Sequence, residues 1–142
     1  MILNRQKNVH VVVPSLEKFA RHVKRELRLN GREVAICLVS DAVMARLNKT
    51  YRGKDKATDV LSFLADKSQA FRRASSSSFL GDIAISPATA KRNAKKYGRT
   101  LAEELRILIL HGLLHLMGYD HETDSGQMER RERRLRRRLG LG

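Results

Sequence analysis

Three histidines in the C-terminal part of the chain have a spacing that suits a metal ion. They are His111, His115 and His121, in the segment HGLLHLMGYDH. Residues four apart lie on the same face of a helix, so His111 and His115 can direct two imidazoles to one point. Gly118 can adopt a positive φ that ends the helix and lets His121 turn back toward that point. The spacing therefore predicts a site with three nitrogen ligands.

A set of three histidines leaves one position of a tetrahedral metal open, which is the arrangement of catalytic zinc. Zinc held in this way lowers the pKa of its bound water to about 7, so hydroxide forms at neutral pH. We therefore expect one Zn²⁺ per chain, held by His111, His115 and His121. The spacing leaves two alternatives open, a structural metal and ordinary helix histidines, and imidazoles also accept other transition metals.

The residue after His111 bears on the reaction that such a site could catalyse. The metalloprotease signature HExxHxxGxxH has the same histidine spacing and places a general-base glutamate at that position. Here the position holds Gly112, which argues against peptide hydrolysis by that route. Asp120, beside His121, is a candidate base or orienter of a ligand, and equally a candidate cap, with Glu122, of a following helix.

Apolar periodicity and turn residues predict the elements that position these histidines. Strands are expected at Val9–Val13 (with Ile2 and Leu3 before it), Glu33–Val39, Asp59–Leu64 and Leu80–Ser86. Helices are expected from a Ser15 cap after Pro14 to Gly31, from Asp41 to about Gly53, from Pro87 to Tyr97, and from a Thr100–Glu103 capping box to Met117. The interleaved order predicts one α/β (α+β) domain over residues 1–142, with a small four-stranded mixed sheet and the metal helix beside a cleft.

The charge balance favours a polyanionic partner. Twenty-nine Lys and Arg against fifteen Asp and Glu leave a net charge of +14 in 142 residues, as is typical of proteins that bind nucleic acid or an anionic surface. Residues 128–142 form an arginine-rich, helix-prone tail with seven arginines and two glutamates. Residues 67–78, with four consecutive serines, are expected to form a low-complexity loop.

Several classes of protein are disfavoured by the same sequence. No stretch of about 18 apolar residues is present, and the arginine-rich tail lacks the broad apolar face that membrane insertion needs. The N-terminus does not resemble a secretory signal, and the single cysteine, Cys37, fits a reducing compartment. Both nucleotide-binding fingerprints, GxGxxG and GxxxxGK[ST], are absent. We therefore expect a basic cytoplasmic protein without a membrane partner.

Three segments of the chain together resemble the YbeY family of bacterial ribosomal-RNA maturation factors. The histidine segment is similar to the family's signature H-G-x-L-H-L-x-G-Y-D-H, and Leu47–Phe63 (LNKTYRGKDKATDVLSF) and Gly81–Ser86 (GDIAIS) are similar to two further segments. The resemblance implies a compact mixed α/β fold and a metal-dependent, single-strand-specific endoribonuclease. It also implies that the three histidines bind zinc at one end of a cleft, in which Arg52 matches an arginine that engages RNA.

The resemblance further implies a biological role and partners. The family matures the 3′ end of small-subunit ribosomal RNA and acts in ribosome quality control, so the expected partners are RNA, especially ribosomal RNA, and the ribosome or its small subunit. Catalysis is expected to depend on Arg52, which holds the phosphate, and on His115, which holds zinc. The residues alone leave other interpretations open: a solvated surface charge for Arg52, a non-catalytic zinc-containing ribosome assembly factor, and, less favoured, a metallopeptidase.

Overall fold

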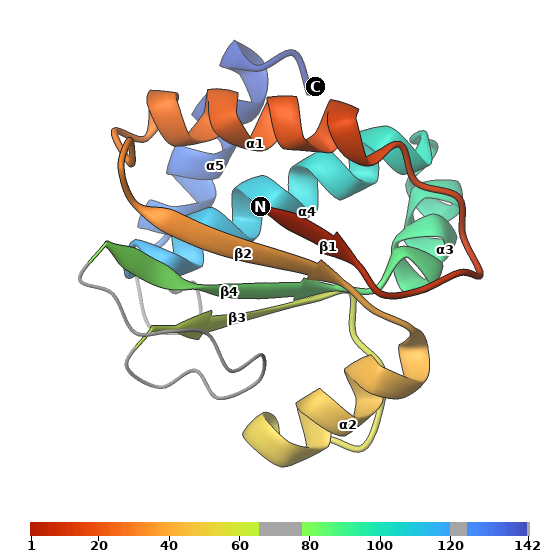
Figure 1. The fold of residues 1–142 in the computed structure, drawn as a ribbon. Helices are drawn as coiled ribbons and strands as arrows, with labels where there is room; N and C mark the ends of the chain where they lie inside the picture. Colours follow the sequence, from red (N-terminus) through yellow and green to blue (C-terminus); the bar gives the residue numbers. More distant parts are fainter. Residues whose placement is uncertain (66–77, 120–124, 142) are drawn as a thin grey trace.

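A mixed sheet with helices on both faces forms the centre of the molecule (Figure 1). The computed structural model describes residues 1–65, 78–119 and 125–141. Its strands are β1 (Ile2–Asn4), β2 (Glu33–Leu38), β3 (Val60–Leu64) and β4 (Phe79–Ile85). Its helices are α1 (Val13–Glu26), α2 (Asp41–Arg52), α3 (Pro87–Tyr97), α4 (Leu101–Leu116) and α5 (Gln127–Arg138). In the order β1-β2-β4-β3, the first two pairs are parallel and β3 is antiparallel to β4. The predicted fold class is confirmed.

The sheet buries apolar side chains on both of its faces. On one face lie α1, α3, α4 and α5, and on the other lies α2 (Figure 1). The first face holds the larger cluster, which joins the sheet to α1, α4 and α5 through residues such as Ile36, Ile83, Val23, Ile109 and Met128. The second face carries a smaller cluster, in which Met44 of α2 packs with Cys37, Leu61, Phe63 and Ala84 of the sheet. Burial on both faces explains the unbroken apolar run in β2.

The first strand lies earlier in the chain than the sequence predicted. β1 is Ile2–Asn4, whereas the predicted strand at Val9–Val13 is wrong, because no strand forms there. The side chain of Gln6 donates hydrogen bonds to Oδ1 of Asn4 and to the carbonyl of Val9, both at 2.9 Å. These bonds turn the chain within residues 4–9, and in the run that follows Val11 and Val13 pack against the larger cluster instead of extending the sheet.

The start of α1 also differs from the prediction. The helix begins at Val13, with Pro14 in its first turn and no side-chain cap, so Ser15 is not the cap. Proline suits the first turn of a helix, because the N–H that it lacks would have no acceptor there. Pro14 therefore begins a helix and does not end a strand.

The helix that carries two of the histidines begins as predicted. The hydroxyl of Thr100 accepts a hydrogen bond from the backbone N–H of Glu103, and the Glu103 carboxylate accepts one from the N–H of Thr100. The backbone hydrogen bond from Thr100 holds the pKa of the Glu103 carboxyl below its usual value. After α4 ends, Gly118 takes a φ of 99°, in agreement with the predicted break.

The arginine-rich tail contains the last helix. It forms α5, whose apolar residues Met128 and Leu135 are buried against the larger cluster. Within the described part of the chain, no helix is long and apolar enough to cross a membrane. Most of the serine-rich segment, residues 67–77, lies outside the described residues.

Candidate metal centre and basic pocket

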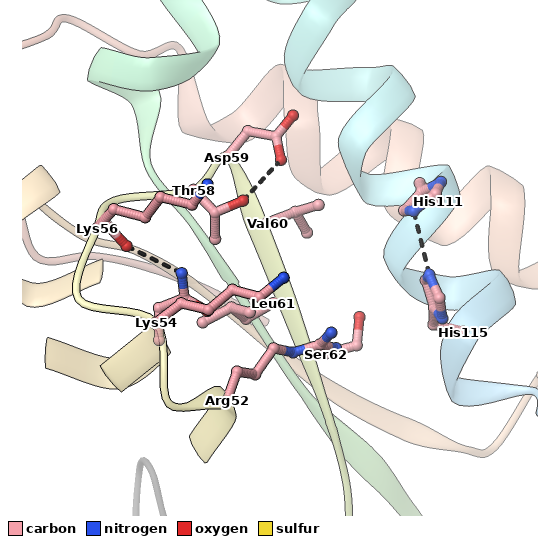
Figure 2. A pocket seen from close by; sticks show the side chains of 11 residues that line it. Arg52, Lys54, Lys56, Thr58, Asp59, Val60, Leu61, Ser62, His111 and His115 are labelled. Carbon is pink, nitrogen blue, oxygen red and sulfur yellow. Dashed lines mark hydrogen bonds between the residues drawn. The ribbon is translucent and has the colours of Figure 1, made fainter. Parts of the chain in front are cut away.

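His111 and His115 lie one turn apart on α4 and bring their imidazoles together. Their Nε2 atoms are 3.1 Å apart, and Figure 2 shows the two rings joined by a dashed line. In a tetrahedral zinc site with metal–nitrogen bonds of about 2.0–2.1 Å, two ligand nitrogens stand about 3.3 Å apart. The separation of the Nε2 atoms therefore fits two neighbouring ligands of one metal ion. Two of the three predicted ligands meet at one point.

The third predicted ligand, His121, lies outside the described residues, and so does Asp120. Among residues 1–65, 78–119 and 125–141, no three His, Cys, Asp or Glu side chains form a group that could hold a metal ion. Among the described residues, the donors that lie together are thus the two imidazoles of His111 and His115. Their chemistry and spacing suit zinc.

A glutamate that the sequence did not single out contacts the first histidine. Oε1 of Glu132, on α5, lies 2.7 Å from Nδ1 of His111. The other carboxylate oxygen, Oε2, lies 3.8 Å from Nη1 of Arg136. Glu132 is 21 residues from His111 and stands among arginines, so only the packing of α5 on α4 reveals the contact.

Gly112, between the two histidines, is required by the packing of α4 on the sheet. A Cβ atom at this position would lie 2.9 Å from two side-chain carbons of Ile83 on β4, closer than real Cβ atoms approach. The carbonyl of Gly112 also accepts a hydrogen bond of 3.3 Å from the hydroxyl of Ser62 on β3. A side chain at this position would require Ile83 to shift, so packing disfavours a glutamate at the place of the general base in the metalloprotease signature.

Beside the histidines lies a pocket of about 350 Å³ with a basic lining. Its walls come from α2, the loop after α2, β3 and α4, and its lining residues are Asn48, Arg52, Lys54, Lys56, Thr58, Asp59, Val60, Leu61, Ser62, His111 and His115. Figure 2 shows Arg52 and Lys54 extending from the α2 side toward β3, with the imidazoles on α4 facing the same space. Arg52, predicted to engage RNA, therefore shares one pocket with His111 and His115.

The three pocket cations carry charge that no described carboxylate neutralises. Arg52, Lys54 and Lys56 take part in none of the salt bridges found between described residues. Asp59 is the only carboxylate among the described lining residues. The pocket therefore has an excess of positive charge beside the two imidazoles, which suits an anionic ligand.

Arg52 owes its position to the way in which α2 ends. The helix stops there because Gly53 adopts a left-handed conformation, with φ of 70°, and its N–H bonds back to the last turn. The side chain of Asn48, which is buried in that last turn, donates a hydrogen bond of 2.9 Å to the carbonyl of Lys56. This bond fastens the loop that carries Lys54 and Lys56 to the end of the helix.

The start of α2 is fastened to α3. The Asp41 carboxylate accepts hydrogen bonds from the hydroxyls of Ser86 and Thr89 and from Arg92, at 2.6, 2.7 and 2.9 Å. Partial burial raises the pKa of the Asp41 carboxyl, but these three donors outweigh it and hold that pKa below its usual value. Both ends of α2 are therefore fixed, which sets the position of one wall of the pocket.

Comparisons with known proteins match this chain to one family over nearly its whole length. The family model described as Endoribonuclease YbeY matches residues 1–140. The chain is 43% identical over 128 residues to the Endoribonuclease YbeY of Solibacter usitatus, covering 90% of this chain and 80% of that one. It is 39% identical over 140 residues to the Endoribonuclease YbeY of Sulfurovum sp. strain NBC37-1, covering 98% and 90%. A solution structure of TM1509 from Thermotoga maritima matches with a TM-score of 0.62 and 27% identity, over 94% of this chain and 85% of that one.

Proposed function

The chain belongs to the Endoribonuclease YbeY family, and on this premise we propose that it is a zinc-dependent endoribonuclease specific for single-stranded ribosomal RNA. The observation that carries the proposal is the pair of Nε2 atoms of His111 and His115, 3.1 Å apart in the wall of a basic pocket. An imidazole pair suits a metal ion, and the cations opposite suit a phosphate.

The metal is assigned to His111, His115 and His121. Zinc bound by three imidazoles supplies a Lewis acid and a water of lowered pKa. The chain's own part is to present neutral Nε2 atoms at fixed positions, which α4 does by placing His111 and His115 one turn apart. The pocket of about 350 Å³ next to these atoms leaves room for part of a nucleotide strand.

Arg52 is assigned to the scissile phosphate. A guanidinium donates two parallel N–H bonds to phosphate oxygens, and those bonds strengthen as charge grows on the phosphate in the transition state. Lys54 and Lys56 line the same pocket and add attraction for the neighbouring phosphates. His115 acts through the metal, and Arg52 acts on the substrate directly.

The biological setting that we propose is ribosome maturation in the cytoplasm. The net charge of +14 suits a polyanionic partner as large as the ribosome. The proposed substrate is the 3′ end of small-subunit ribosomal RNA, with a second role in ribosome quality control. In both cases the RNA segment entering the pocket is proposed to be single-stranded, because a single strand can lie over β3, between the α2 side and the histidines of α4, with a phosphate against Arg52.

Elemental analysis paired with cleavage assays tests the proposal. Freshly purified protein is expected to hold about one zinc per chain, and His115→Ala to lose most of it and to slow cleavage of single-stranded ribosomal RNA about 1000-fold. His22→Ala, an exposed histidine on α1, is the matched control and leaves both properties unchanged.

Removing the metal with a chelator gives the experiment that can contradict the proposal. Wild-type protein stripped of metal is expected to stop cleaving and to recover when zinc is added back. Full cleavage by the stripped protein would overturn the zinc mechanism. Bound zinc without any cleavage, in preparations in which His115→Ala and wild type are equally inactive, would leave a zinc-containing RNA-binding assembly factor as the function.

A further inference from the structure

The inner face of the arginine-rich helix α5 meets the candidate metal centre. The helix carries seven arginines and two glutamates, and the glutamates lie in different surroundings. Glu129 has a side chain that is 70% exposed and pairs with Arg133. The Glu132 side chain is only 17% exposed and lies against His111, itself 21% exposed. The half-buried carboxylate of this basic helix is thus the one that contacts the histidine.

The contact selects one form of the His111 ring. A carboxylate has no proton to donate, so at 2.7 Å the hydrogen bond requires the proton on Nδ1 of His111. A neutral imidazole carries only one N–H, and Nε2 therefore keeps its lone pair. That nitrogen is the one that faces His115.

The second histidine is consistent with this assignment. Two Nε2 atoms 3.1 Å apart can share a hydrogen bond only if one donates and the other accepts. With the proton of His111 on Nδ1, its Nε2 is the acceptor and His115 is the donor. In the metal-free protein the lone pair of His111 Nε2 therefore faces His115, and the Nε2 proton of His115 has to leave before both rings can bind one metal ion.

We propose that Glu132 is a positioning residue that holds His111 in the Nδ1–H form and aims its Nε2 at the metal. The inference rests on the proposed function, since it needs a metal at the histidines. Carboxylates behind a metal-bound histidine fix the ring and raise its basicity, and their loss weakens metal binding about 10- to 100-fold. Arg136, whose Nη1 lies 3.8 Å from Oε2 of Glu132, helps to hold the carboxylate in place.

Zinc affinity measured by competition with a coloured chelator tests the role. Glu132→Gln keeps an oxygen that can accept from Nδ1–H but removes the charge, so zinc binding is expected to weaken about tenfold, and about 100-fold in Glu132→Ala. Glu129→Gln removes the same charge from the same helix, one turn away from the contact, and leaves the affinity unchanged. Thermal melting of the metal-free proteins checks that the variants fold.

Nitrogen-15 NMR of the histidine rings gives a readout that needs no metal. Metal-free wild type and Glu129→Gln are expected to show His111 with its proton on Nδ1, and Glu132→Ala to show it mainly on Nε2. A wild-type His111 protonated on Nε2, or equal zinc affinity in wild type and Glu132→Ala, would overturn the inference and leave the proposed function standing. Failure of the wild type itself to bind zinc would overturn both.

Discussion

Two groups of cations in this molecule differ in what fixes them. The pocket group (Arg52, Lys54 and Lys56) stands at the end of α2 and in the loop after it, beside the two imidazoles. The α5 group (Arg130, Arg133, Arg134 and Arg137) consists of exposed side chains around a shallow hollow of about 300 Å³. With about 3.6 residues per turn, these four arginines share one face of α5, and Glu132 lies on the opposite face.

From this contrast we propose separate tasks for the two groups of cations. The pocket group is held relative to the imidazoles by the cap at Gly53 and the bond from Asn48, and in the proposed function it would act on the scissile phosphate. The α5 group lies on the outside of a helix, and we propose that it attracts RNA phosphates without a fixed relation to the reacting bond. The pocket group is thus expected to control rate, and the α5 group affinity.

Among the variants that distinguish the pocket group from the α5 group, Arg52→Ala is expected to have the largest effect, which is on the cleavage rate. Removing one preorganised donor to a transition-state oxyanion costs about 100- to 1000-fold in rate, so cleavage at saturating RNA falls by about that factor while the zinc content stays at the wild-type level. Lys49→Ala is the matched control, because Lys49 lies on the same last turn of α2 and does not line the pocket. Equal losses in both variants would show that charge near α2, and not the Arg52 guanidinium, matters.

A smaller effect, on affinity, is expected from replacing the α5 group with glutamine. Each phosphate contact to single-stranded RNA contributes about 0.7 to the slope of log K against log salt, so the loss of four lowers that slope by up to about 3 and weakens binding at physiological salt about tenfold or more. The cleavage rate at saturating RNA stays near that of wild type.

A charge-matched control keeps this prediction specific to α5. Four exposed lysines on α1 and α3 can be replaced by glutamine in the same way: Lys18, Lys91, Lys95 and Lys96. This variant has the same net charge, so any difference between the two comes from position. If both variants lose the same affinity and slope, or if the α5 variant cleaves slowly at saturation, the division of tasks between the two groups is wrong.

Local patterns in the sequence predicted the parts of the site that lie on one element. The separation of four residues placed His111 and His115 on one face of α4, and the capping box at Thr100 gave the start of that helix. Arg52 could be assigned only through the family resemblance, because nothing in its own neighbourhood distinguishes it from other surface arginines. Its place in the pocket depends on how α2 packs against the sheet.

Contacts between distant elements were the parts that the sequence did not reveal. Glu132 meets His111 only because Met128 and Leu135 pack α5 against the core, and the charge pattern of the tail hides this carboxylate among arginines. The strand expected at Val9–Val13 has strong β propensity, yet the side chain of Gln6 turns the chain before that run could pair. Propensity is local, and these outcomes depend on partners elsewhere in the fold.

The smallest effect is expected for Asn48→Ala, which loosens the pocket group without removing a charge. Asn48 is 2% exposed, and its side-chain bond to the Lys56 carbonyl is one of the links between the last turn of α2 and the loop, beside the backbone bond from the Lys54 N–H to the Asn48 carbonyl. Losing a buried hydrogen bond costs about 1–3 kcal/mol of stability. Because Gly53 still ends the helix at Arg52, cleavage efficiency is expected to fall only a few-fold, as measured by kcat/KM beside a thermal melt. Asn48→Asp, which cannot donate to the carbonyl and also adds a buried negative charge to the pocket, is expected to lose more than Asn48→Ala in both measurements. A rate loss as large as that of Arg52→Ala would mean that Lys54 and Lys56, and not the Arg52 guanidinium alone, hold the reacting phosphate. The whole loop, together with Arg52, would then be what distinguishes the pocket group from the α5 group.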